Sequence, residues 1–438
     1  MHLNRLVSGR SSRLLRNRKK LGAASLAAAD VTGKAAGFVI TPFLANRMGA
    51  ADFGVLNLYL SVTQILTYVI SLGGAGLLAV EYIRNGYTSA RRLRAANLRL
   101  SLWIMIALLI VSVTVSWQLP SAVPLVSGVL IVAVSYVQAL NVCELSYYRG
   151  AQAYSWAVTG QFAFAILNVV LTVLAFELDS PTVTNRLLSI ALAGGVVQTV
   201  YVLELRRKPF ESADKATNRS NTSLILRFGL SLFVHQASQW IRTSVDRFFV
   251  SAYLGLAAAG VYSVGVTLAM AEAMFFNAIT QQLQPFLYRR LLNRDFSGFW
   301  RIQIWYALAV VGFTAVYYLL LLLSFRSLFA NEYNQAIGLL PALLGGAAAQ
   351  SIYHVVSLAS FYERRGGQIS SATASALVVH LGGLGALAAL GQVTITNVAF
   401  VFFASSVVAM LAMFWLSRRV VNQLRLTRPS PTGQEGPA

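Results

Sequence analysis

The sequence predicts an all-α polytopic membrane protein with about 12 transmembrane helices, because apolar runs long enough to cross a bilayer recur along the whole chain. Hydrophobic residues make up 56% of the 438 residues and charged residues only 11%, whereas a soluble domain has about 25% charged residues. The expected spans are residues 22–44, 55–82, 98–117, 123–147, 155–176, 186–205, 224–251, 256–284, 302–325, 335–360, 369–390 and 395–416. The segments between them are too short to form a soluble domain.

Basic residues predict the orientation of these spans. The net charge of +20 would suggest nucleic-acid binding in a soluble chain, but most of the 35 Lys and Arg residues lie in the two tails and in every second loop. The other loops hold only Arg47, Arg186 and Arg326. The positive-inside rule therefore places both termini in the cytoplasm. We expect the basic tail to contact membrane lipids, and we expect no nucleic-acid partner.

An internal repeat is visible at the start of each half of the chain. The stretch MGAADFGVLNLYLSV at 48–62 aligns without gaps with LGLAAAGVYSVGVTL at 254–268. The matched pairs include Gly49 with Gly255 and Gly54 with Gly260. A second match pairs RGAQ at 149–152 with RGGQ at 365–368. Recurring matches in the same order indicate two copies of one structural unit.

The repeat predicts two lobes of six helices each, and because six is an even number the lobes are related as a parallel repeat. The expected organisation is a basic cytoplasmic tail at 1–20, an N-lobe at 21–206 with helices 1–6, a cytoplasmic linker at 207–223, a C-lobe at 224–417 with helices 7–12, and a cytoplasmic tail at 418–438. Transporters of this architecture hold their substrate between the lobes, near the middle of the bilayer.

Polar side chains follow one face of the seventh expected span. This stripe consists of Ser231, His235, Gln239, Arg242 and Asp246, spaced by three or four residues. The first span has a similar stripe, formed by Asp30, Lys34, Gly37 and Thr41. Residues at such spacing share one helix face, and an ionisable side chain at the bilayer centre costs at least about 2–3 kcal/mol unless it faces water or a partner. We therefore expect both stripes to face one water-filled cleft between the lobes.

Two interpretations of the charged residues stay open. Arg242 with Asp246, and Asp30 with Lys34, are each four residues apart, a spacing that suits structural ion pairs. Alternatively, Lys34 and Arg242 bind an anionic substrate, which we favour because a guanidinium is well suited to phosphate recognition. Arg247 points away from the stripe and is expected to snorkel or to contact a loop.

Two further residues stand outside this stripe. Trp240 is expected to pack or to contact lipid, because it lies on the opposite side of the same span from Arg242. Glu272 lies midway along the eighth span and is, with Asp246, a candidate for coupling to a proton or sodium gradient. A helix–helix hydrogen bond explains Glu272 nearly as well.

Catalysis is not expected. The chain has no P-loop and no room for a nucleotide-binding domain, and its external loops are short. The spacing of its His, Cys, Asp and Glu residues does not suggest a metal site. We therefore expect neither enzymatic activity nor a cofactor.

Three stretches resemble a known family. MGAADFGVLNLYLSVTQILTYVISLGGAGLLAVEYIRNG at 48–86, SVDRFFVSAYLGLAAAGVYSVGVTLA at 244–269 and LFANEYNQAIGLLPALLGG at 328–346 are similar, in this order, to segments of polysaccharide-biosynthesis flippases. These flippases form part of the multidrug/oligosaccharidyl-lipid/polysaccharide exporter superfamily. Asp246 and Arg247 match the family's "DR" element.

The resemblance implies a function. It implies a flippase of the bacterial inner membrane that moves an undecaprenyl-pyrophosphate-linked oligosaccharide, of the O-antigen or exopolysaccharide type, by alternating access through a cationic central cavity. Lys34 and Arg242 would meet the anionic head group, and the substrate-binding set would also include Gln239, His235, Asp30 and Asp246. A polysaccharide polymerase and export proteins are expected as further partners.

Three alternatives compete with this function. A multidrug cation antiporter of the same superfamily would need an acid-dominated cavity. A peptidoglycan-precursor flippase commonly has two additional spans. A non-transporting membrane scaffold would gain little from buried charge.

Overall fold

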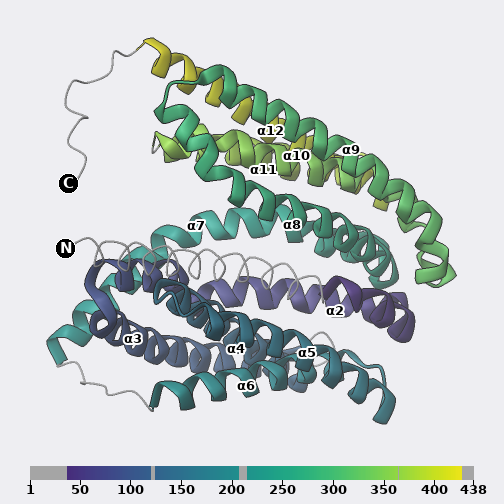
Figure 1. Cartoon of the computed structure of the whole chain (residues 1–438). Helices are drawn as coiled ribbons and strands as arrows, with labels where there is room; N and C mark the ends of the chain where they lie inside the picture. Colours follow the sequence, from purple (N-terminus) through teal and green to yellow (C-terminus); the bar gives the residue numbers. More distant parts are fainter. Residues whose placement is uncertain (1–36, 120–123, 207–214, 364, 427–438) are drawn as a thin grey trace, which may run out of the picture. The chain divides into compact units, whose positions relative to one another are not determined.

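The computed structural model describes residues 37–119, 124–206, 215–363 and 365–426, and these residues form helices connected by short turns, with no strand among them. The helices are α2 (Thr41–Ser71), α3 (Gly74–Gln118), α4 (Leu125–Gly150), α5 (Tyr154–Leu178), α6 (Val183–Arg206), α7 (Lys215–Leu254), α8 (Leu256–Leu292), α9 (Phe296–Leu328), η1 (Asn331–Tyr333), α10 (Ala336–Tyr362), α11 (Gly366–Ala389) and α12 (Ile395–Leu426) (Figure 1). Asp30 and Lys34 lie outside the described residues, as do most of the first expected span and the chain ends.

The described helices confirm the predicted fold class. Within the described ranges, nine helical segments are long and apolar enough to cross a membrane: Thr41–Gln118, Leu125–Gly150, Tyr154–Leu178, Val183–Glu204, Leu256–Leu292, Phe296–Leu328, Ala336–Tyr362, Gly366–Ala389 and Ile395–Leu426. Helix α7 is not among them. The protein is thus an all-α polytopic membrane protein.

Two compact units divide the chain. Unit 1 consists of residues 1–251 and 256–260, and unit 2 of residues 252–255 and 261–438. Most of α7 therefore packs with the helices that precede it in the sequence. The predicted lobe boundaries at 206 and 224 stay a prediction.

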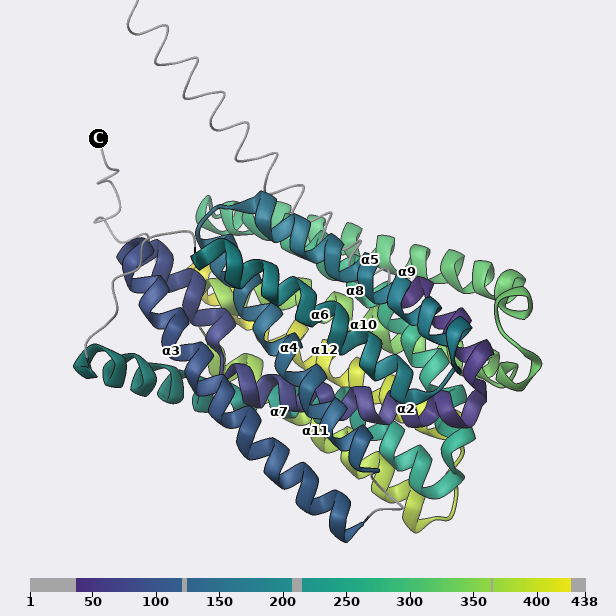
Figure 2. The ribbon, with the colours of Figure 1, turned by 90° about the horizontal axis from the view of Figure 1, so that it is seen from below.

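Unit 1 is built around α4, which packs against α2, α3 and α6 (Figure 2). Its core contains several tyrosines as well as aliphatic side chains: Leu78, Leu93, Cys143, Tyr147, Tyr148, Val197, Tyr201 and Ile225 are all buried. Helix α3 continues through the basic segment 84–97 with one local kink at Gly86, where φ is 78°. Ala, Leu and Arg are strong helix formers, which explains why this polar segment stays helical.

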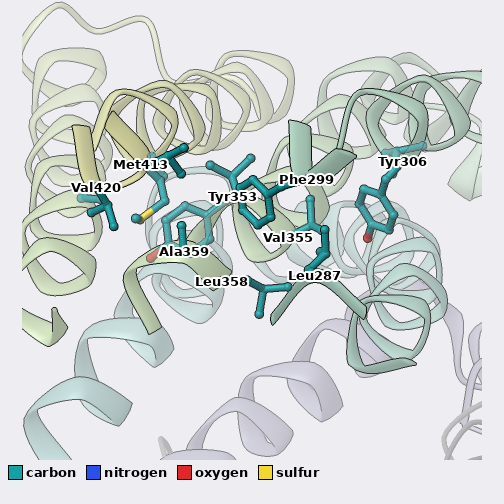
Figure 3. Close-up of a cluster of buried hydrophobic side chains, with 14 of the residues drawn as sticks. Leu287, Phe299, Tyr306, Tyr353, Val355, Leu358, Ala359, Met413 and Val420 are labelled. Carbon is teal, nitrogen blue, oxygen red and sulfur yellow. The ribbon is translucent and has the colours of Figure 1, made fainter. Parts of the chain in front are cut away.

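Unit 2 is built around α10, which packs against α9, α11 and α12. Figure 3 shows part of its core, in which Leu287, Phe299 and Tyr353 are labelled. Small residues let the helices approach closely: a Cβ atom on Gly345 would lie 2.9 Å from the Phe403 ring of α12. The two glycines at 345 and 346 are therefore packing points.

The glycines of the internal repeat adopt matching backbone conformations. Gly49 has φ 78° and ψ 164°, and Gly255 has φ 88° and ψ 171°. This region of backbone space is almost restricted to glycine. Each glycine therefore allows a sharp break just before the helical segment that follows it, and the correspondence between 48–62 and 254–268 extends to backbone geometry.

The other matched glycine pair forms a reciprocal contact within unit 1. A Cβ atom on Gly54 would overlap the backbone carbonyl oxygen of Leu256, and one on Gly260 would overlap that of Ala50. Residues 50 and 54 correspond to residues 256 and 260 in the repeat, so each segment contacts the other through the same positions. Such a contact is isologous.

The match between RGAQ and RGGQ is out of register. The turn after α4 has a hydrogen bond from Ala153 N to Tyr148 O (3.0 Å), and the turn after α10 has one from Arg365 N to Ser360 O (2.8 Å). Ala153 and Arg365 also share nearly the same φ and ψ. Ala153, rather than Arg149, is therefore the structural counterpart of Arg365. The alignment of RGAQ with RGGQ pairs residues that do not occupy equivalent positions in the two turns.

Candidate functional site

The polar stripe of α7 is partly described. Gln239, Arg242 and Asp246 lie on one continuous helix, as predicted, and Arg242 and Asp246 are only 5% and 3% exposed. Gln239 is half-buried. His235 lies on the same helix, but its side chain is outside the described part. The stripe therefore brings a buried guanidinium and a buried carboxyl to one helix face, and its role in binding stays a prediction.

The opposite side of α7 packs against α2. Trp240 Nε1 donates a hydrogen bond to the backbone carbonyl of Ser61 (2.7 Å), and Arg247 Nη1 donates to the Ser61 hydroxyl (3.3 Å). Trp240 therefore packs, as expected. Arg247 contacts the interior of a neighbouring helix, so the expectation of snorkelling or a loop contact was wrong. Sequence spacing reveals the face on which a residue lies but not the helix that covers that face.

Glu272 is a buried carboxyl in unit 2. It is 1% exposed, and its Oε1 accepts a hydrogen bond from the Thr314 hydroxyl of α9. Its Oε2 makes no hydrogen bond with the described residues, and no Lys, Arg or His among them forms an ion pair with it. The helix–helix hydrogen bond considered from the sequence is therefore present, and a role in ion coupling stays a prediction.

A cavity of about 460 Å³ lies beside Thr314 within unit 2. Its walls come from α9, α10 and α12 and are apolar apart from Thr314 and Tyr318. On α10 the lining includes Pro341, Gly345 and Ala348, and small residues at this helical spacing leave the space open. Thr314 lines the cavity and donates to Glu272. The Thr314 hydroxyl therefore lies between the cavity and the Glu272 carboxyl. This cavity was not predicted from the sequence, although the small residues of α10 were a signal for it.

Unit 1 contains a buried ion pair that the sequence analysis also missed. Arg94 Nε on α3 lies 2.7 Å from Glu144 Oε1 and 2.9 Å from Oε2 on α4. Both residues are buried, and the Arg94 guanidinium also lies 5.9 Å from the centre of the Tyr147 ring. Arg94 was counted only as one of the basic residues that set orientation.

Arg186 is a second buried cation of unit 1. It was predicted to lie in a loop, but it is in the first turn of α6 and only 5% exposed. Its Nη1 donates to Asn168 Oδ1 and to Thr172 Oγ1 of α5, both at 2.6 Å. The loop prediction was wrong because the helix begins before the apolar run that was used to find it.

Comparison with known families identifies the chain. The family model described as "Polysaccharide biosynthesis protein" matches residues 20–289. Two curated proteins of Haemophilus influenzae are similar: "Lsg locus putative protein 1", 25% identical over 271 residues, and an "Uncharacterized membrane protein", 23% identical over 269 residues. Each match covers 60% of this chain, and it spans 65% and 63% of the two relatives.

Solved structures share the fold over nearly the whole chain. An inward-facing multidrug resistance MATE family transporter of the MOP superfamily gives a TM-score of 0.73 at 13% identity, covering 92% of this chain and 96% of the transporter. A MOP superfamily transporter from Pyrococcus furiosus gives a TM-score of 0.64 at 15% identity, covering 93% and 97%. At this level of identity the likeness to the solved transporters is one of fold, and the chain belongs to the polysaccharide biosynthesis protein family.

Proposed function

We propose that this protein is a flippase that moves an undecaprenyl-pyrophosphate-linked oligosaccharide from the cytoplasmic to the periplasmic leaflet of a bacterial inner membrane. The observation that carries the proposal is the buried, charged face of α7, with Arg242 and Asp246, in a chain of the polysaccharide biosynthesis family. Buried charges inside membrane proteins commonly mark a path for polar substrates.

The chemistry of the substrate supports a cationic path. A pyrophosphate-sugar head group that crossed hydrocarbon unaided would lose water from its charges and hydroxyls without any replacement, at a prohibitive cost. In the proposed mechanism Arg242 and Lys34 replace that water for the phosphates, while Gln239, His235 and Asp30 contact the head group. Arg is suited to this role because its planar donors match phosphate oxygens. The polyprenyl tail stays in the bilayer throughout.

The proposed orientation follows from the basic residues. With both termini in the cytoplasm, the tail at 1–20, the segment 84–97 and the linker at 207–223 face the anionic cytoplasmic leaflet. The lipid-linked precursor would be collected on this side. Alternating access of the two predicted lobes would then open the path to the periplasm.

Glu272 is the proposed coupling residue, with Asp246 as a second candidate. A buried carboxyl that accepts from the neutral Thr314 hydroxyl and forms no ion pair with a described residue is stabilised when it takes up a proton or a sodium ion. Uptake of the proton or sodium ion on one side of the membrane and its release on the other would couple the ion gradient to alternating access of the lobes.

The direct test is translocation of a labelled polyprenyl-pyrophosphate oligosaccharide in proteoliposomes. The intact protein should move the head group, and Arg242→Ala and Lys34→Ala should abolish movement while the protein stays folded. Arg326→Ala, which removes an exposed arginine in the last turn of α9, is the matched control and should retain transport. Normal transport by Arg242→Ala would remove the cationic path from the proposal.

A multidrug cation antiporter is the second candidate, and the buried acid Glu272 is the observation in its favour. In that case the intact protein would export organic cations along an ion gradient and move no lipid-linked sugar. Asp246, Asp30 and Glu272 would then form the site in place of Arg242 and Lys34.

A further inference from the structure

One end of unit 2 is strongly basic. It is formed by the last turns of α8 and α12 and by the first turns of α9. Residues 289–301 and 418–425 contain seven arginines and one acidic residue, Asp295. All seven arginines are exposed: Arg289, Arg290, Arg294, Arg301, Arg418, Arg419 and Arg425. Like charges at this density repel one another unless anions lie close by, and a single carboxylate offsets only a small part of this charge.

Two of these arginines hold the helices together. Arg290 forms an ion pair with Asp295, which caps α9 by accepting a hydrogen bond from Gly298 N at 2.8 Å. Arg294 Nη2 donates to Leu424 O at 2.9 Å. This carbonyl belongs to the last turn of α12, where carbonyls lack intrahelical partners. The two arginines therefore have structural roles, and their contacts place the turn between α8 and α9 beside the end of α12.

The other five arginines form no ion pair with a described residue. We call them the arginine patch: Arg289, Arg301, Arg418, Arg419 and Arg425. Two of them lie over aromatic rings. The Arg419 guanidinium is 3.4 Å from the centre of the Trp415 ring, and that of Arg425 is 5.4 Å from the centre of the Phe296 ring. A guanidinium stacked on a ring is held through its face, so its in-plane N–H groups can still donate to an anion.

The surface of α12 beside the patch is apolar. Leu411, Phe414 and Trp415 are 56%, 43% and 52% exposed. A Trp near the end of a transmembrane helix marks the boundary between hydrocarbon and head groups. Arg419 lies one turn further along α12, about 6 Å away, which is the level of the head groups. A soluble anion would use the arginines alone, whereas a membrane lipid fits both surfaces, with its phosphate on the patch and its chains on the apolar side chains.

We propose that the arginine patch binds the phosphate of an anionic phospholipid, with Arg419 and Trp415 at its centre. The planar donors of arginine match phosphate oxygens, and the neighbouring arginines attract a net negative head group more strongly than a zwitterionic one. The bound lipid offsets charge that Asp295 leaves unbalanced, and so stabilises the junction of α8, α9 and α12. This surface is separate from the α7 stripe, and the lipid bound here is not the transported molecule.

Thermal unfolding of the purified full-length protein in detergent measures this binding. Phosphatidylglycerol, phosphatidylcholine and inorganic phosphate are titrated in three separate arms at matched ionic strength. Each arm compares the intact protein with Arg419→Gln, Arg419→Lys and the double variant Arg419→Gln/Arg425→Gln. The matched control is Arg326→Gln, which removes an exposed arginine at the opposite end of α9.

Phosphatidylglycerol should stabilise the intact protein and Arg326→Gln at concentrations at which phosphatidylcholine and phosphate have no effect. Arg419→Gln should weaken the apparent affinity for phosphatidylglycerol about fivefold, the contribution of one basic residue near a charged membrane surface. The double variant should weaken it at least about tenfold, and Arg419→Lys, which keeps the charge, should lose less than Arg419→Gln. The two single variants are sufficient for the test if the double variant does not fold.

Three results would overturn the proposal. Equal stabilisation by phosphatidylglycerol and phosphatidylcholine would show that the charge of the head group is not recognised. An equal loss of affinity in Arg326→Gln and Arg419→Gln would show that the patch is not the binding surface. Stabilisation by inorganic phosphate as strong as that by phosphatidylglycerol would assign the arginines to a soluble anion. Because the readout is lipid binding, each of these results leaves the flippase proposal standing, and a failure to flip lipid-linked sugar leaves this surface standing.

Discussion

The two units handle a buried carboxyl differently. In unit 1, Glu144 meets a buried guanidinium, and both of its oxygens accept from Arg94 Nε. In unit 2, Glu272 is equally buried at 1% exposure, but its Oε1 accepts from the neutral Thr314 hydroxyl and its Oε2 has no hydrogen-bond partner among the described residues. The first arrangement balances its own charge, whereas no described residue forms an ion pair with Glu272.

This difference separates structure from function among buried charges. Desolvating an ion is costly, and a permanent partner with good geometry offsets that cost at all times. A carboxyl without such a partner is costly to keep charged and cheap to neutralise. Arg94 and Glu144 satisfy each other's charge within the fold. Glu272 calls for another reason, and exchange of a proton or a cation is the reason we propose.

The largest effect is expected from breaking the pair in unit 1. Glu144→Gln leaves the buried Arg94 without a countercharge, which should lower the free energy of unfolding by about 3–5 kcal/mol. Denaturant unfolding in detergent measures this loss. The control is Glu177→Gln in the exposed pair with Arg47, which should cost no more than about 1 kcal/mol. Equal losses in the two variants would show that burial does not determine how much each ion pair contributes to the free energy of unfolding.

A smaller loss is expected from Thr314→Val. The substitution leaves Glu272 without its described donor, at a cost of about 1–3 kcal/mol for a buried acceptor. Thr199→Val is the matched control, because the exposed Thr199 hydroxyl donates to Gly195 O of its own helix and to no other described residue. A Thr314 variant as stable as the control would mean that Glu272 does not depend on this hydroxyl.

Glu272→Gln should change stability least among the buried sites, by less than about 1.5 kcal/mol, because an amide can still accept from Thr314 and carries no charge. Its effect should appear in transport. Proteoliposomes with Glu272→Gln should flip substrate at a rate that no longer responds to an imposed proton or sodium gradient, whereas Glu177→Gln keeps the response. A gradient-dependent Glu272→Gln protein would contradict the coupling role.

The smallest effect concerns an exposed counterpart of the Arg94–Glu144 pair. Asp295 lies between α8 and α9, and its pKa is lowered first by the hydrogen bond from Gly298 N and then by those from Arg290 and Ser297. The stability it contributes is present above the ordinary Asp pKa of 3.8 and is lost as the pH falls through its lower folded value. Acid unfolding of Asp295→Asn should therefore show a slightly weaker pH dependence. A steeper pH dependence of stability in Asp295→Asn would contradict the lowered pKa of Asp295.

Patterns along the chain were sufficient for some features and not for others. The spacing of glycines predicted the repeat, and helical spacing predicted the α7 face, because both depend on local geometry. Arg94 and Arg186 were counted alongside exposed arginines, since the positive-inside rule registers charge and not burial. Their partners, Glu144 on α4 and Asn168 and Thr172 on α5, follow from tertiary packing, which no single-sequence pattern encodes.

The reciprocal contact of Gly54 and Gly260 has an evolutionary consequence. If the two halves were identical separate chains, one glycine-to-alanine change would set two methyl groups against two carbonyl oxygens, because each Cβ meets the backbone of the other segment. In the fused chain the same change places only one methyl group against one carbonyl oxygen. Fusion therefore halves the number of clashes that one mutation creates at this contact and lets the two segments diverge, while the close approach still requires glycine at both positions.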